Sequence, residues 1–144
     1  NNARYIDYFM NAREDHLMNA YDLNVYDYTK ETGAVWVVAQ NQIAYVRPAW
    51  FMETVVIQST LLHAGNRKLL VEMRMLNADK TELKAVIWAV FAHFDVNTQR
   101  SIEHLPEMMD FLKSVENPLP EAIDFDARVS ELKAKYRKEA VVAA

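Results

Sequence analysis

Hydrophobic residues recur at three- and four-residue steps near the beginning of the chain and at two-residue steps after Val35. The first spacing is typical of an amphipathic helix and the second of β-strands, so residues 3–20 are predicted to form a helix. Asn2 is its expected N-cap, because an asparagine side chain accepts a hydrogen bond from an early helical N–H. Residues 21–34 are polar, contain Gly33 and are predicted to form a connection.

Four strand candidates follow, at residues 35–46, 53–63, 67–76 and 83–95. One face of the first is predicted to carry Val37, Ala39, Asn41, Ile43 and Tyr45. In the third, alternation directs Lys68, Glu72 and Arg74 outward. The fourth is apolar on both faces and is therefore predicted to lie in the middle of the sheet.

The last third of the chain is predicted to be helical. Pro106 begins a short helix, since proline is tolerated in a first turn, and Pro118 and Pro120 mark a linker. Residues 124–139 form a charged helix with an apolar stripe of Phe125, Val129, Leu132 and Tyr136. One long helix followed by a four-stranded antiparallel meander indicates an α+β fold.

Composition narrows the function classes. A chain of 144 residues is long enough for one domain with a sizeable core. The net charge of −4 gives no reason to expect a nucleic-acid partner, and the absence of cysteine excludes a thiol nucleophile. No apolar run approaches the roughly 20 residues that a membrane-spanning helix needs. With two glycines and no glycine-rich motif, a phosphate-binding loop is excluded as well.

Two segments carry a resemblance to a known family. Asn1-Asn2-Ala3-Arg4-Tyr5 resembles the Asn-Asn-x-x-Tyr segment that opens the central helix of hotdog-fold acyl thioesterases of the 4-hydroxybenzoyl-CoA thioesterase type. Residues 43–49, Ile-Ala-Tyr-Val-Arg-Pro-Ala, resemble that family's strand ending in Tyr-x-Arg-Pro-Ala. The family usually continues with Gly-Asp, where this chain has Met52 and Glu53.

The resemblance covers residues 1–115 and implies a hotdog fold, in which an antiparallel sheet wraps around a long central helix. It implies a thioesterase domain at residues 1–117, with residues 118–144 added as a linker and helix. The family's first strand, catalytic aspartate and histidine would precede Asn1. The substrate carbonyl would lie at the helix start near Asn2 and Ala3, although a simple capping role for Asn2 is the alternative.

The resemblance also suggests substrate contacts. Asn1 and Tyr5 would lie against the substrate, and Arg47 would contact pantetheine or phosphate, or else fix the strand end. Arg67 and Lys68 follow a hairpin and would bind the phosphates of coenzyme A, with an ordinary charged hairpin as the alternative.

Other polar residues are weaker candidates for a catalytic or metal-binding role. Glu14, Asp15 and Asp7 are helix carboxylates with more ordinary roles as surface charges. The four histidines are widely spaced in the sequence and are not expected to form a catalytic or metal site.

The expected activity is therefore hydrolysis of acyl-CoA or acyl-carrier-protein thioesters, without a metal or other cofactor. A non-catalytic acyl-binding or regulatory hotdog protein is the alternative, and a hotdog dehydratase is a third possibility that no motif supports. The resemblance further implies a cytoplasmic homodimer or dimer of dimers, with no nucleic acid and no membrane as partner.

Overall fold

The computed structural model describes Tyr5, Phe9 and residues 24–50 and 52–143. Tyr5 and Phe9 are helical, in agreement with the predicted N-terminal helix, and the rest of that helix lies outside the described residues. Phe9 is fully buried among the side chains of one face of the sheet. None of the helices in the described ranges is long and apolar enough to cross a membrane.

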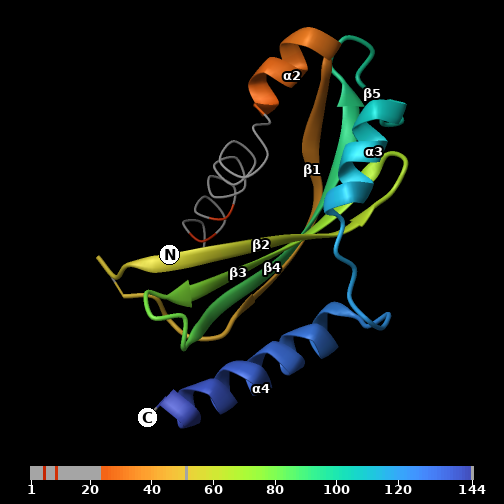
Figure 1. Cartoon of the computed structure of the whole chain (residues 1–144). Helices are drawn as coiled ribbons and strands as arrows, with labels where there is room; N and C mark the ends of the chain where they lie inside the picture. The colour runs from red at the N-terminus through yellow and green to blue at the C-terminus, as the bar shows by residue number, and fades with distance from the viewer. Residues whose placement is uncertain (1–4, 6–8, 10–23, 51, 144) are drawn as a thin grey trace.

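A single antiparallel sheet forms the centre of the molecule (Figure 1). Its strands are β1 (Ala34–Tyr45), β2 (Val55–Ala64), β3 (Lys68–Asn77), β4 (Leu83–Asp95) and the short β5 (Arg100–Ser101). The order across the sheet is β1-β4-β3-β2, and β5 pairs with β4. The predicted position of the fourth strand is confirmed, but the simple meander is wrong, because β1 pairs with β4 and not with β2.

A β-bulge in β1 changes which side chains share a face. The pairing with β4 shifts by one residue between Val38 and Gln40, so Trp36 and Ile43 both pack into the same core. The prediction of one continuous face from Val37 to Tyr45 is therefore wrong, because an extra residue reverses the alternation.

Residues 25–32 are helical rather than part of a loop, which corrects the predicted connection. Helix α2 (Val25–Thr32) is capped by Asn24, whose side chain accepts hydrogen bonds from the backbone N–H groups of Tyr26 and Asp27. It ends at Gly33, whose φ of 73° is the left-handed conformation that favours glycine after a helix. Because α2 is mostly polar, it shows no hydrophobic periodicity from which a helix could be predicted.

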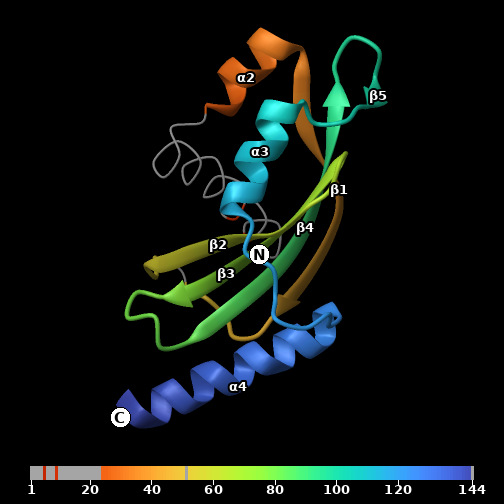
Figure 2. The same ribbon diagram turned by 45° about the vertical axis from the view of Figure 1, so that its right-hand side comes forward.

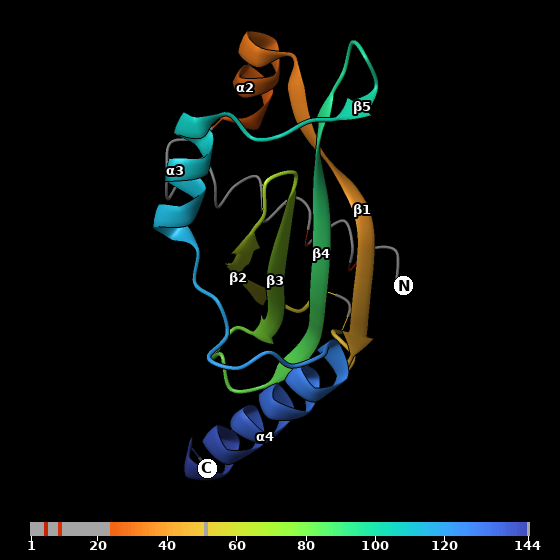
Figure 3. The ribbon, with the colours of Figure 1, turned by 90° about the vertical axis from the view of Figure 1, so that its right-hand side faces the viewer.

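The two faces of the sheet carry separate cores. The inner face packs with α2 and α3 (Pro106–Val115), and the outer face packs against α4 (Phe125–Ala143), as Figures 2 and 3 show. The inner core is formed by Phe9, Tyr28, Trp36, Met73, Met75, Ile87, Phe91 and their neighbours. The predicted stripe of α4 is confirmed, since Phe125, Val129, Leu132 and Tyr136 are all buried.

Glu72 shows the consequence of covering both faces. Alternation correctly placed it on the face opposite Met73, but that face is covered by α4, so the carboxylate is fully buried instead of solvated. A buried carboxylate requires compensating cations and donors, and Arg128 on α4 supplies part of them. Alternation predicts a face of a strand, but not what covers that face.

Candidate active site

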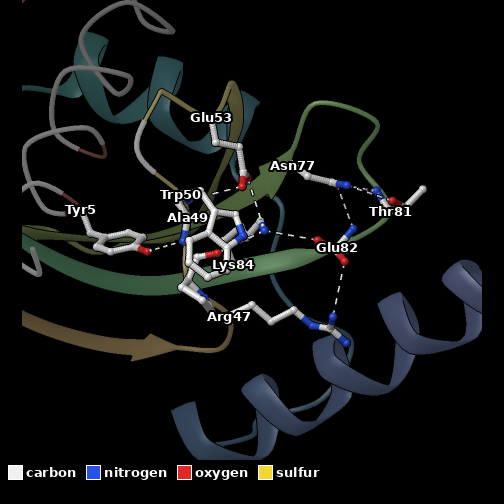
Figure 4. A network of polar contacts seen from close by, with 10 residues as sticks. Tyr5, Arg47, Ala49, Trp50, Glu53, Asn77, Thr81, Glu82 and Lys84 are labelled. Carbon is white, nitrogen blue, oxygen red and sulfur yellow. Dashed lines mark hydrogen bonds and ion pairs between the residues drawn. The ribbon is translucent and has the colours of Figure 1, made fainter.

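The two segments that resemble thioesterase motifs meet at one end of the inner face (Figure 4). The Tyr5 hydroxyl accepts a 2.8 Å hydrogen bond from the backbone N–H of Ala49. The Tyr5 ring packs edge-on against Tyr45, with ring centroids 5.2 Å apart. Residues 44 positions apart in the sequence are thereby held together at the beginning of the first helix.

A buried lysine fixes the loop that carries Ala49. Lys84 is 5% exposed in its side chain, and its ammonium donates to the carbonyl of Pro48 at 3.2 Å. It forms ion pairs with Glu82 at 3.2 Å and with Glu53 at 3.3 Å. Two carboxylates and a carbonyl compensate for the desolvation of the ammonium, so the loop is held against β4.

Glu53 uses only part of its hydrogen-bonding capacity. One oxygen, Oε1, accepts from the backbone N–H of Trp50 at 3.3 Å. Oε2 is buried and, among the residues the structure describes, is the one buried side-chain oxygen to which no protein group donates a hydrogen bond. The nearby Lys84 balances its charge at 3.3 Å but does not donate a hydrogen bond to it, which is unusual for a buried oxygen.

Met52 occupies a conformation that usually belongs to glycine. Its φ of 67° lies in the left-handed region, where a side chain costs roughly 1–2 kcal/mol. The Met52 side chain is 84% exposed and that of Trp50 is 71% exposed, so the loop presents apolar groups beside Tyr5.

Arg47 belongs to the same end of the sheet but points to its outer rim. Its guanidinium forms an ion pair with Glu82 at 3.4 Å, and its side chain is 59% exposed. Its backbone N–H donates to the carbonyl of Lys84. These contacts favour the structural alternative for Arg47, in which it fixes the strand end.

Arg67 and Lys68 lie at the opposite end of the sheet. Lys68 pairs with Ala92 and Tyr45 with Ala85, which are seven residues apart on β4 and so separated by roughly 23 Å. Arg67 donates to the carbonyl of Ser101 at 2.8 Å. Both basic residues line an open hollow of about 530 Å³. Within one chain, these predicted substrate contacts are therefore not brought to the Tyr5 site.

Two histidines that are distant in sequence lie side by side, a proximity that their sequence spacing does not predict. The rings of His93 and His104 are buried, with centroids 4.5 Å apart. Trp36 Nε1 donates to His104 at 2.9 Å, and the Tyr28 hydroxyl lies 2.7 Å from His93 Nε2. Sequence spacing missed this pair because β4 and the following loop bring it together.

The histidine pair is best explained as core structure. Each Nδ1 faces a backbone carbonyl, that of Ile102 for His93 and that of Gly65 for His104. Burial lowers the pKa of both rings below the usual value, and for His104 the neighbouring His93 lowers the pKa further. Neutral rings that donate through Nδ1 and accept through Nε2 fit every one of these contacts.

The remaining candidates of the helix lie outside the described residues. These are Asn1, Asn2 and Ala3 at the helix start and the carboxylates Asp7, Glu14 and Asp15. Their roles stay predictions. Lys84 and Glu53, by contrast, were missed as a pair, and only the Gly-Asp departure at Met52 and Glu53 singled out the second of them.

Comparison with known proteins agrees with this geometry. A family model described as the thioesterase-like superfamily matches residues 1–115, and the chain belongs to that superfamily. No curated protein matches the chain significantly in sequence.

Solved structures show the same fold at low identity. The probable thioesterase YbaW from Escherichia coli is 23% identical with a TM-score of 0.69, over 81% of this chain and 86% of that one. The DHNA-CoA thioesterase from Staphylococcus aureus is 16% identical with a TM-score of 0.71, covering 78% and 76%. Staphylococcus aureus SAV2348, solved in complex with CoA, is 10% identical with a TM-score of 0.69, covering 87% and 83%. The chain has the predicted α+β hotdog fold.

Proposed function

We propose that this protein hydrolyses the thioester bond of an acyl-CoA to give the free acid and coenzyme A. The observation that carries the proposal is the hydrogen bond between Tyr5 and Ala49, which joins both thioesterase-like segments in one site. Membership of the thioesterase-like superfamily supports the reaction class. The CoA bound to a relative of the same fold supports coenzyme A as the carrier.

The helix start is proposed to polarise the thioester carbonyl. Free backbone N–H groups at a helix N-terminus bind negative charge, and the carbonyl oxygen becomes negative as the tetrahedral intermediate forms. Asn2 and Ala3 are the residues proposed to present these groups. Tyr5 follows them in the helix, and its contact with Ala49 fixes the helix start relative to the loop at residues 46–54.

Glu53 is proposed to hold the attacking water through Oε2. The water oxygen attacks the carbonyl carbon, its proton passes to a carboxylate, and collapse of the intermediate expels the thiolate, which takes up the proton. Lys84 positions the carboxylate at 3.3 Å. The acid expected before Asn1 stays a prediction, and the reaction as written requires no metal and no further cofactor.

A homodimer is proposed to complete the site. The edge strand β1 exposes the side chains of residues 37–42, including Val37 and Val38, and an unpaired apolar edge is a site for pairing with another strand. Antiparallel pairing with a second copy would place the Ala34 end of one sheet beside the Tyr45 end of the other. The Arg67 hairpin of the second copy would then approach this substrate site.

The proposal is tested by measuring thiol release from a panel of aliphatic and aromatic acyl-CoA thioesters with the full-length protein. We expect turnover that a chelator does not abolish. Asn2→Leu should lower kcat on the order of tenfold, less than the loss of a direct oxyanion donor, because the cap acts through the amides. Tight binding of acyl-CoA without thiol release would instead support the acyl-binding alternative.

A further inference from the structure

A second hollow, of about 360 Å³, lies on the outer face of the sheet, between α4 and strands β2 and β3. Its polar lining comes from Gln58, Thr60, Glu72, Arg74, Asn117, Arg128 and Lys135. It is separate from the site around Tyr5, which is on the inner face. The hydrolase mechanism assigns no role to these residues.

Among the described residues that line this hollow, Glu72 is the one carboxylate, and its oxygens are already saturated. Glu72 accepts two hydrogen bonds from Arg128, at 2.8 and 2.9 Å, and one from Trp88 at 2.9 Å. Arg74 donates a fourth at 2.5 Å. Glu72 thus balances one positive charge and has no acceptor capacity left for the remaining donors of the hollow.

The two arginines keep donors that these contacts do not use. A guanidinium has five N–H groups. Arg74 uses one on Glu72 and one on Thr60, which leaves three. Arg128 uses two on Glu72 and one on Glu131, which leaves two. These side chains are only 12% and 20% exposed, and both line the hollow, so an acceptor there would meet donors on largely enclosed side chains.

The local charge favours an anion. Three cations, Arg74, Arg128 and Lys135, face the two carboxylates Glu72 and Glu131, which leaves a local charge of +1 in a chain whose net charge is −4. A tetrahedral oxyanion accepts many hydrogen bonds at once and matches the fork geometry of arginine. The volume exceeds what one phosphate ion fills, so an organic group attached to it also has space.

We propose that this hollow binds a phosphate group, as the free ion or as a phosphate monoester. Arg74 belongs to β3, whereas Arg128 and Lys135 belong to α4. A bound phosphate therefore bridges the terminal helix and the sheet and stabilises their contact. The inference rests on the hollow alone and holds whether or not the inner site hydrolyses thioesters.

The test is titration of the full-length protein with inorganic phosphate and with adenosine 5′-monophosphate, at constant ionic strength in chloride, followed by calorimetry. We expect saturable binding of both, with tighter binding of the monoester if the organic group enters the hollow. Equal affinities would identify the free ion as the ligand. No saturable binding of either anion would overturn the proposal.

A matched pair of variants locates the binding site. Lys133 and Lys135 are both exposed on α4, but of the two only Lys135 lines the hollow. Lys135→Gln should weaken phosphate binding on the order of tenfold, as expected for one charge-assisted hydrogen bond, and Lys133→Gln should leave it unchanged. Equal effects of the two substitutions would show non-specific attraction and would overturn the assigned site.

Discussion

Two carboxylates with buried oxygens, one on a strand and one in a loop, are compensated in different ways. Glu72 on the outer face is fully buried and accepts four hydrogen bonds from three side chains. Glu53, in the loop between β1 and β2, accepts one from a backbone N–H and leaves Oε2 without a protein donor. A saturated carboxylate holds elements together, whereas the proposed catalytic role of Glu53 rests on an oxygen that no protein group saturates.

The largest expected effect is a loss of folding stability in Glu72→Ala. Removing one partner of a buried ion pair typically costs about 3–5 kcal/mol, because the remaining charges stay buried without compensation. Here Arg74 and Arg128 would both lose their pairing with Glu72, and Arg128 would keep only the exposed Glu131. Urea unfolding measures the loss of the free energy of unfolding.

Glu131→Ala is the control for that substitution. Glu131 pairs with the same Arg128 at 3.4 Å, but its side chain is 57% exposed. Exposed pairs contribute about 0–1 kcal/mol, so this variant should unfold almost as the wild type does. Equal losses for both variants would show that Glu72 is no more structural than a surface acid.

The next largest effect is expected from acid, which should lower the folding stability that Glu72 contributes on the outer face. Burial alone would raise the pKa of Glu72, but hydrogen bonds from Arg128, Trp88 and Arg74 lower the pKa below its ordinary value of 4.5. The folded state therefore binds fewer protons than the unfolded one, and the stability due to Glu72 is complete above about pH 4.5 and is lost as the pH falls through the lower native value.

Glu72→Gln isolates this acid effect, because glutamine keeps the size of the side chain but does not titrate. Between pH 5 and pH 3, the wild type should lose more free energy of unfolding than the variant, measured by chemical denaturation at each pH. Parallel losses in the two proteins would assign the acid sensitivity to other groups.

Glu53→Gln should affect turnover more than stability, since Glu82 continues to pair with Lys84. Glutamine keeps an oxygen for the Trp50 N–H but cannot take a proton from water. Removal of a general base commonly lowers kcat by about 10²-fold or more. Glu82→Gln is the control, since Glu82 also pairs with Lys84 but is not proposed to contact the water. Unchanged kcat in Glu53→Gln would remove Glu53 from the mechanism.

The smallest effect is expected from Met52→Gly, which relieves the left-handed backbone at φ 67°. The free energy of unfolding should rise by about 1 kcal/mol. Lys80 has φ 60° in the turn between β3 and β4, so Lys80→Gly should give a similar gain. If the exposed Met52 side chain contacts the acyl group, only Met52→Gly raises KM. Equal KM values in both variants would exclude that contact.

Much of the fold was predictable from the sequence, because strands on a covered sheet alternate regularly. The predicted bounds of β4 match the structure, and the apolar stripe of α4 packs as expected. Prediction failed where one local event changed the pattern. The bulge after Val38 reversed the faces of β1. In the polar helix α2, only the capping residues Asn24 and Gly33 indicated a helix.

The candidate site was predictable only in part. The Tyr5 and Ala49 segments were identified by their resemblance to one family, and the fold brings them into contact. Alternation could not show that Glu72 is covered by α4, since the covering residue Arg128 is 56 positions away. The pairing of β1 with β4 likewise brings Lys84 to the loop that contains Pro48. No local sequence pattern predicts this long-range pairing.

The contact between Tyr5 and Ala49 is the centre of the proposed active site, and kcat of Tyr5→Phe for acyl-CoA hydrolysis tests it most directly. Phenylalanine keeps the ring against Tyr45 but removes the acceptor at 2.8 Å from the Ala49 N–H. We predict a loss on the order of tenfold in kcat, with an unfolding free energy lower by about 1 kcal/mol. Tyr26→Phe, at a side chain that is 69% exposed on α2, should behave as the wild type. A Tyr5→Phe variant with wild-type kcat would contradict the proposed site.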